Sequence, residues 1–280
     1  MKKTTFSDFQ AELRATGAYR TAEDHRAPQR AKAGALTTIR FSWGVVSVFP
    51  KTGLYRAFGR LTCKKWEELC FRAVQTAEKL GMNVNIEGFE TLRDIKEPAV
   101  LLSNHMSTTE TVLLPPIIRA FRPFSYVAKA SLAHLPGLEK AAEEMRMVPI
   151  GRISPREDLM NILKVGTERI RTDGDHFLIF PQGTRCEVFS SKKFSSIGAK
   201  LAERAAAPIV PIVVDTRSQP TRKSGVFKKI FKDLGPVDPT IDIRIACGPV
   251  IPAGKSKDMQ AATFDWMANK LESWGLPVER

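Results

Sequence analysis

A histidine and a carboxylate stand five residues apart, directly after a short apolar run. The segment reads Asn104-His105-Met106-Ser107-Thr108-Thr109-Glu110 and follows residues 99–103. Imidazole has a reference pKa of about 6.5, so His105 can be neutral near pH 7 and accept a proton. A carboxylate bonded to one ring nitrogen fixes the tautomer and raises the basicity of the other. The pair fits a general base if His105 lies in a turn and Glu110 in the first turn of a helix.

The same residues also fit a structural role. Ser107 followed three residues later by Glu110 is the pattern of a capping box, in which the glutamate reaches back to the helix start. A single histidine after a strand is also more often structural or exposed than catalytic. Capping would itself bring Glu110 near the loop, so the two roles need not exclude each other.

A second polar segment, Pro181-Gln182-Gly183-Thr184-Arg185, follows the apolar run 177–180. The proline ends the strand, and Gly183 lets the backbone turn tightly or approach a ligand. Arg185 offers a planar fork that suits a phosphate, and Thr184 adds a hydroxyl donor. Alone, this segment reads as an ordinary turn with a solvated arginine. Beside a general base, it suits the activation of a hydroxyl on a molecule held by its phosphate.

Strands and helices alternate around these two segments. Apolar runs indicate strands at 84–86, 99–103, 124–128, 177–180, 209–214 and 241–247, and helical spacing recurs near 61–80, 107–120, 136–146, 155–172, 196–206 and 258–274. The alternation predicts an α/β fold with a mixed, largely parallel sheet flanked by helices, in a main domain spanning 61–280. Ligands of such sheets usually lie beyond the carboxyl ends of the strands, where both polar segments are expected.

The first 60 residues differ in character from the rest. Residues 1–35 are polar and charged, which predicts a loosely ordered or surface-lying arm. Residues 36–60 mix aromatic residues with arginines, as in a helical segment that faces a membrane, although a helix packed on the main domain fits equally. Residues 226–232 alternate apolar and basic groups and are a second candidate for contact with anionic lipid. Neither a signal peptide nor a transmembrane helix is expected, because the longest early apolar stretch is about half of the ~20 residues needed to span a bilayer.

The charge balance predicts an anionic partner. The chain has 280 residues, 43% of them hydrophobic, with 43 lysines and arginines against 30 acidic residues and a net charge of +13. Nucleic acid, a phospholipid surface, or an acidic carrier and phosphate-bearing substrates would all fit. The sequence lacks RNA-recognition signatures and zinc-finger spacing, so nucleic acid is not expected. Four cysteines without a Cys-x-x-Cys pair indicate a reduced, cytosolic setting.

The chain resembles the glycerol-phosphate and lysophospholipid acyltransferase family over residues 83–252. The family motif Asn-His-x-Ser-x-x-Asp/Glu matches residues 104–110. The motif Phe-Pro-Glu-Gly-Thr-Arg-Ser matches 180–186, except that Gln182 and Cys186 replace its glutamate and serine. Two further family elements resemble residues 148–152 and 207–212. The combination of four motifs in one order is specific, although each alone is not.

The resemblance implies an enzyme without a metal ion or cofactor, and the lack of an expected spanning helix suggests peripheral attachment at the cytoplasmic face of the membrane. A fatty acyl group would pass from acyl-CoA or an acyl carrier protein to the hydroxyl of 1-acylglycerol 3-phosphate. His105 would be the general base, held by Glu110. The other implied site residues surround the acceptor: Arg185, Thr184, Gly183 and Arg152 at its phosphate, and Gln182 against its glycerol part.

Gln182 keeps other interpretations open, because it removes a negative charge beside the acceptor. The acceptor would then differ from lysophosphatidate, for example glycerol 3-phosphate or an acylated amino-acid lipid. A non-catalytic basic membrane-binding module with the same fold is the rival from another class. A Ser-His-Asp hydrolase is disfavoured, because the sequence has no Gly-x-Ser-x-Gly elbow.

Overall fold

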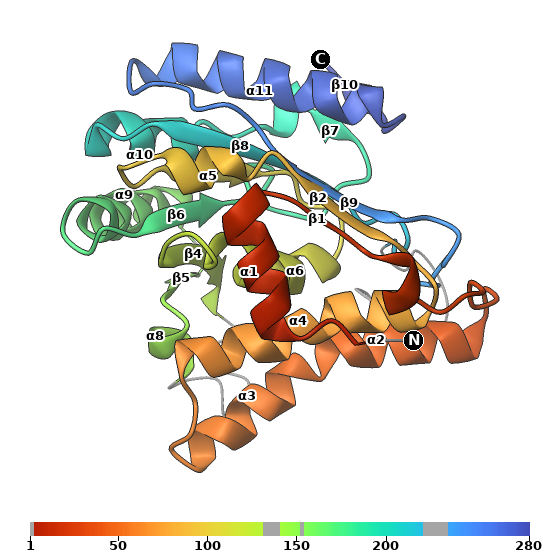
Figure 1. Ribbon diagram of the computed structural model, residues 1–280. Coiled ribbons are helices and arrows are strands. Elements are labelled where there is room, and N and C mark those ends of the chain that lie inside the picture. Colours follow the sequence, from red (N-terminus) through yellow and green to blue (C-terminus); the bar gives the residue numbers. More distant parts are fainter. Residues whose placement is uncertain (1–2, 131–140, 152–153, 221–234) are drawn as a thin grey trace.

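The central feature of the computed structural model is a sheet whose strands run in the order β1-β2-β9-β8-β3-β6-β4-β5 (Figure 1). The structure describes residues 3–130, 141–151, 154–220 and 235–280. The β1–β2 and β8–β9 pairs are antiparallel, and the other neighbouring pairs are parallel. The strands are β1 Tyr19–Arg20, β2 Val84–Glu87, β3 Val100–Ser103, β4 Phe124–Lys129, β5 Met147–Ile150, β6 His176–Ile179, β8 Ile209–Asp215 and β9 Ile243–Cys247. The predicted mixed, largely parallel sheet is confirmed.

Helices cover both faces of this sheet (Figure 1). They are α1 Phe6–Thr16, α2 Ala35–Val46, α3 Val48–Ala57, α4 Cys63–Lys79, α5 Glu90–Asp94, α6 Thr109–Ile118, α8 Ala141–Glu144, α9 Pro155–Arg171, α10 Ile197–Ala205 and α11 Ser256–Ser273. Short 3₁₀ turns lie at Glu23–His25 and Ser191–Lys193, and β7 Phe189–Ser190 pairs in parallel with β10 Val278–Glu279. The strand assignments β1, β5, β7 and β10 are additions to the predicted set.

The central strands are buried on both faces, and this explains their continuous apolar runs. In β3, Leu101 packs in the core cluster formed with α1, α2, α4 and α6. Val100 and Leu102 pack in the opposite cluster, formed with α9, α10 and α11. Successive side chains of a strand point to opposite faces, so a strand covered on both sides needs an apolar residue at every position.

The long helix α4 forms where helical spacing predicted it. The predicted apolar positions of this helix are buried: Trp66, Leu69, Cys70, Ala73, Val74 and Ala77. The Thr62 side chain caps the start by accepting a hydrogen bond of 3.1 Å from the Lys65 backbone N–H. Gly81 follows the end with φ +77°, a conformation that favours glycine. This helix packs against α6, against helices α2 and α3, and against strand β2 of the sheet.

Within residues 1–35, where a loosely ordered or surface-lying arm was expected, residues 6–20 are ordered as α1 and β1. Phe9 and Leu13, one helical turn apart in α1, are fully buried, and Phe9 contacts the ring of Phe71 at a centroid distance of 4.8 Å. Strand β1 extends the sheet by pairing with β2. The apolar stripe of α1 is narrow, so the charged residues around it dominated the sequence pattern.

The assignment of residues 36–60 to a membrane interface and the division of the chain at residue 60 stay predictions. Residues 226–232 lie outside the described residues. Within the described ranges, none of the helices combines the length and the apolar character needed to cross a bilayer.

Candidate active site

The candidate site lies where three parallel strands end at the same edge of the sheet. Strand β3 is hydrogen-bonded on one side to β8 and on the other to β6. His105 follows β3, the segment 181–185 follows β6, and Thr216 follows β8. The sheet order thus brings together three loops that are far apart in the sequence, at the edge where ligands of such sheets usually bind.

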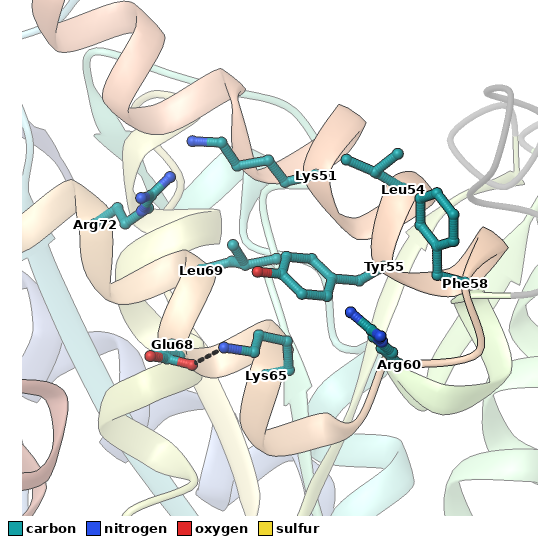
Figure 2. Close-up of a pocket in the computed structure, with 9 residues that line it drawn as sticks. All are labelled: Lys51, Leu54, Tyr55, Phe58, Arg60, Lys65, Glu68, Leu69 and Arg72. Carbon is teal, nitrogen blue, oxygen red and sulfur yellow. Dashed lines mark hydrogen bonds and ion pairs between the residues drawn. The ribbon is translucent and has the colours of Figure 1, made fainter.

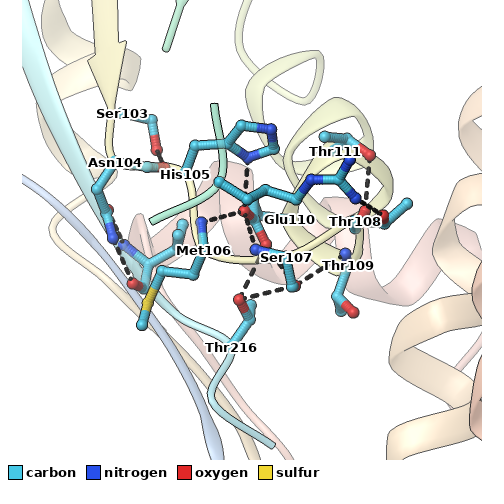
Figure 3. Close-up of polar contacts among 12 residues, drawn as sticks. Ser103, Asn104, His105, Met106, Ser107, Thr108, Thr109, Glu110, Thr111 and Thr216 are labelled. Carbon is cyan, nitrogen blue, oxygen red and sulfur yellow. Dashed lines mark hydrogen bonds and ion pairs between the residues drawn. The ribbon is translucent and has the colours of Figure 1, made fainter. Parts of the chain in front are cut away.

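Glu110 is fully buried in the first turn of α6, and its carboxylate accepts five hydrogen bonds (Figure 3). Its Oε1 lies 2.8 Å from Nδ1 of His105 and accepts the backbone N–H groups of Met106 and Ser107 at 2.6 and 2.7 Å. Its Oε2 accepts the hydroxyls of Ser107 and Thr216 at 2.7 and 2.9 Å. The carboxylate thus contacts the histidine and also reaches back to Ser107, although the N-cap of α6 is Thr108, one residue later than the expected Ser107.

These contacts keep Glu110 ionised in a buried position. Burial by itself raises the pKa of Glu110. The hydrogen bond and charge of His105, together with the hydrogen bonds of Ser107, outweigh burial and hold this pKa below its usual value of 4.5. An ionised carboxylate at Nδ1 requires the proton of a neutral His105 ring to sit on that nitrogen, so Nε2 is the nitrogen that can accept a proton.

His105 is held in place by its ring and by its backbone. The imidazole stacks on Phe180 with ring centroids 4.5 Å apart, and 15% of its side chain is exposed. Its carbonyl oxygen accepts the backbone N–H of Cys186 at 2.8 Å, which joins the two polar segments directly. The preceding residue, Asn104, bonds to the backbone of β8 through its side chain. Its Nδ2 donates to the Val214 carbonyl at 2.9 Å, and its Oδ1 accepts the Val214 N–H at 2.8 Å.

The second segment forms the tight turn that its glycine predicts. Gly183 has φ +65°, in the left-handed region, and its N–H bonds to the carbonyl of Phe180 at 2.9 Å. Arg185 donates from Nη1 to the Thr108 hydroxyl at 2.9 Å, so its guanidinium lies beside the loop that carries His105. Thr184 is exposed at the tip of the turn.

Gln182 is buried and holds this loop. Its Nε2 donates to the carbonyl of Val188 across 3.1 Å. A glutamate at this position has no proton to donate when ionised, so the glutamine makes a contact that the family's usual residue cannot. Gln182 also borders a small hollow together with Asn104 and Met106.

Most of the predicted site residues meet at this edge. The structure places His105 against Glu110, and Arg185 with Gln182, Gly183 and Thr184 in the adjoining loop. Arg152 lies outside the described residues. Across those residues, no group of three or more histidine, cysteine or acidic side chains is arranged to hold a metal ion.

Two residues of the site were missing from the sequence interpretation. Thr216 donates to Glu110, and Gln219 joins Thr109 at the start of α6 to Ser42 of α2 through hydrogen bonds of 3.0 and 2.8 Å. All these side chains are buried. The sequence feature that singled out His105, a polar residue close after a predicted strand, applies to Thr216 as well. Gln219 carries no comparable signal.

Comparison with known proteins identifies relatives of this chain. The model of a family described as acyltransferase matches residues 83–215. The 1-acyl-sn-glycerol-3-phosphate acyltransferase of Pseudomonas aeruginosa is 34% identical over 179 residues, which are 63% of this chain and 66% of that protein. The enzyme of the same name from Saccharomyces cerevisiae is 31% identical over 165 residues, covering 56% of this chain and 52% of that protein. The match therefore spans slightly under two thirds of the first relative and about half of the second.

A solved structure shares the fold. The crystal structure of the 1-acyl-sn-glycerophosphate acyltransferase PlsC from Thermotoga maritima superposes with a TM-score of 0.56 and 16% sequence identity. The superposition covers 86% of this chain and 95% of the other. At this identity, the likeness concerns the fold: a largely parallel sheet flanked by helices.

Proposed function

Because this chain belongs to the acyltransferase family of enzymes, we propose that it transfers a fatty acyl group from a thioester donor to the hydroxyl of 1-acylglycerol 3-phosphate. The observation that carries the proposal is the contact of 2.8 Å between Nδ1 of His105 and the buried carboxylate of Glu110. The names of the relatives support the acceptor. The donor is acyl-CoA or an acyl carrier protein, and the product is phosphatidic acid.

In the proposed reaction, His105 removes the proton of the acceptor hydroxyl through Nε2. The hydroxyl oxygen attacks the carbonyl carbon of the thioester, and the C–S bond breaks as the new ester forms. The departing thiolate takes the proton back from the imidazolium, so no acyl-enzyme forms and the protons balance. Glu110 stabilises the imidazolium while it exists. General-base assistance of this kind contributes about 10²–10⁴-fold to the rate.

The acceptor phosphate binds Arg185, with Gly183 and Thr184 shaping the pocket and Arg152 as a further cation. A guanidinium fork suits a phosphate, and the contact of Arg185 with Thr108 supports a position close to the general base. Gln182 faces the glycerol part of the acceptor. Its donation to Val188 favours a second candidate, another lysolipid acceptor, because the amide replaces a charge in this loop.

The proposal includes peripheral attachment to the cytoplasmic face of an anionic membrane through residues 36–60. Leu36, Ile39 and Trp43 recur on one face of α2 and are 61–64% exposed, although the opposite face of this helix is buried. Leu54 of α3 and Phe58, directly after this helix, are 57% and 70% exposed. Large apolar side chains at helical spacing on an exposed face suit insertion into a lipid interface.

Thiol release by the purified full chain tests the reaction. Acyl-CoA or an acylated carrier protein is supplied with lysophosphatidate, with glycerol 3-phosphate, or with no acceptor. Release should require lysophosphatidate and disappear in His105→Ala, whereas His25→Ala, which changes a histidine of the N-terminal part, should keep it. Release without an acceptor would identify a hydrolase. Binding to vesicles without release from any acceptor would identify a non-catalytic membrane module.

A further inference from the structure

A basic hollow lies between helices α3 and α4, apart from the candidate active site (Figure 2). Its volume is about 480 Å³, within the range of roughly 300–1,000 Å³ found for ligand pockets. None of the residues 104–110 or 180–186 lines it. The lining is Lys51, Leu54, Tyr55, Phe58, Arg60, Lys65, Glu68, Leu69 and Arg72.

The charge of this lining is strongly positive. It has four cations, and its single carboxylate, Glu68, is engaged in an ion pair with Lys65. Lys65 also lies over the ring of Tyr55, 5.2 Å from its centroid. Burial and, after it, the charge of Arg72 lower the pKa of Lys51, whose ammonium also donates to the Ser47 hydroxyl. An anion in the hollow would relieve this repulsion.

The rim of the hollow is apolar on one side. Leu54 of α3 and Phe58, the residue directly after this helix, both line it and are largely exposed. Figure 2 shows Lys51, Arg60 and Arg72 around the hollow, with Tyr55 between them and Leu54 and Phe58 together at one edge. Cations beside exposed apolar groups match the boundary of a bilayer, where phosphates lie directly above the hydrocarbon.

We propose that this hollow binds the phosphate of an anionic phospholipid, held by Lys51, Arg60 and Arg72, with the lipid chains lying along Leu54 and Phe58. This lipid is neither donor nor acceptor in the proposed reaction. Guanidinium groups suit the role because a planar guanidinium can donate two parallel hydrogen bonds to two oxygens of one phosphate. The site gives the enzyme a preference for membranes that contain anionic lipid, beyond the general attraction of a basic protein.

Vesicle binding by the full chain tests this site. All proteins carry His105→Ala, so that no turnover occurs and the result does not depend on the proposed reaction. The test variant is Arg60→Gln/Arg72→Gln. The matched control is Lys64→Gln/Lys79→Gln, which removes the same charge from exposed positions of α4, outside the hollow and outside residues 36–60. Sedimentation is measured with phosphatidylcholine vesicles that contain or lack phosphatidylglycerol.

The hollow variant, Arg60→Gln/Arg72→Gln, should lose about tenfold more affinity for the anionic vesicles than the control. It loses the proposed binding site, whereas both variants lose the same general attraction between a basic protein and anionic lipid. Both should bind neutral vesicles equally. Arg60→Lys/Arg72→Lys keeps the charge but loses the planar forks, so its affinity for the anionic vesicles should lie between those of the unmodified protein and Arg60→Gln/Arg72→Gln. Equal losses in the hollow variant and the control would overturn the proposal. Displacement of the protein from vesicles by millimolar glycerol 3-phosphate would overturn it too, by identifying a site for a soluble phosphate.

Discussion

The backbone N–H of Cys186 donates a hydrogen bond of 2.8 Å to the carbonyl oxygen of His105. This contact fastens the loop after β6 to the loop after β3 at the residue proposed as general base. The side chain of Arg185, the residue before Cys186, meets Thr108 in the same loop. These contacts join the proposed base to the loop that carries the proposed phosphate ligand, so in the proposed reaction the bound acceptor phosphate would orient the hydroxyl with respect to His105.

Glu110→Gln should lower kcat by about 10²–10⁴-fold while changing the KM for either substrate little. The amide keeps the size of the side chain but cannot stabilise an imidazolium, and it favours the wrong tautomer of His105. Steady-state thiol release measures both constants. A kcat close to that of the unmodified protein would exclude the proposed role of the carboxylate.

Acid should weaken the fold through Glu110. Its pKa is lowered in the folded protein and returns to about 4.5 on unfolding, so its contribution to stability is fully present above that value. The contribution is lost as the pH falls through the lowered folded pKa. Urea unfolding from pH 5 downward should show the stability difference between the unmodified protein and Glu110→Gln shrinking. A constant difference over this range would contradict the lowered pKa.

Thr216→Val should cost about 1.5–3 kcal/mol of stability, because a hydrogen bond to a buried charged group is lost without a change in shape. It should also lower kcat, since the carboxylate is then held by fewer donors. Thr263→Val is the matched control, a buried threonine whose hydroxyl donates only to the Met259 carbonyl among the contacts described. Urea unfolding and thiol release separate the two variants, and equal activity in both would remove Thr216 from the site.

Arg185→Lys should raise the KM for the acceptor by about tenfold or more and change kcat less. Lysine keeps the charge but lacks the planar guanidinium, which can donate two parallel hydrogen bonds to one phosphate. Thr108→Val provides the comparison, because it removes the partner of Arg185 and leaves the guanidinium. A KM that rises for the thioester donor instead of the acceptor would reassign Arg185 to the donor site.

Gln182→Glu should destabilise the protein by about 1–3 kcal/mol, because a buried carboxylate would face the Val188 carbonyl without a proton to donate. Thermal unfolding measures this loss. Gln182→Met has a similar size and no charge, so it loses only the hydrogen bond. The difference between the two variants then gives the effect of the added charge. If Gln182→Glu leaves the melting temperature unchanged, the loop does not depend on this contact.

Local sequence patterns predicted much of the fold and the centre of the site. Apolar runs alternating with helical spacing indicated the largely parallel sheet, since strands covered on both faces must be apolar throughout. His105 and Glu110 were found because they lie in one short segment, where a turn and the start of a helix fix their separation. The same local reading missed α1 within residues 1–35, because its narrow apolar stripe with Phe9 and Leu13 is hidden among charged residues.

Only the tertiary structure decided which distant residues complete the site. Thr216 is 106 positions from Glu110, and Arg185 is 77 positions from Thr108. They meet because β3 lies between β8 and β6, and that order depends on how whole strands and helices pack. The sequence by itself indicated a candidate base, its carboxylate and a candidate phosphate-binding turn. Their assembly at one edge, and the basic hollow between α3 and α4, follow from packing that no local pattern encodes.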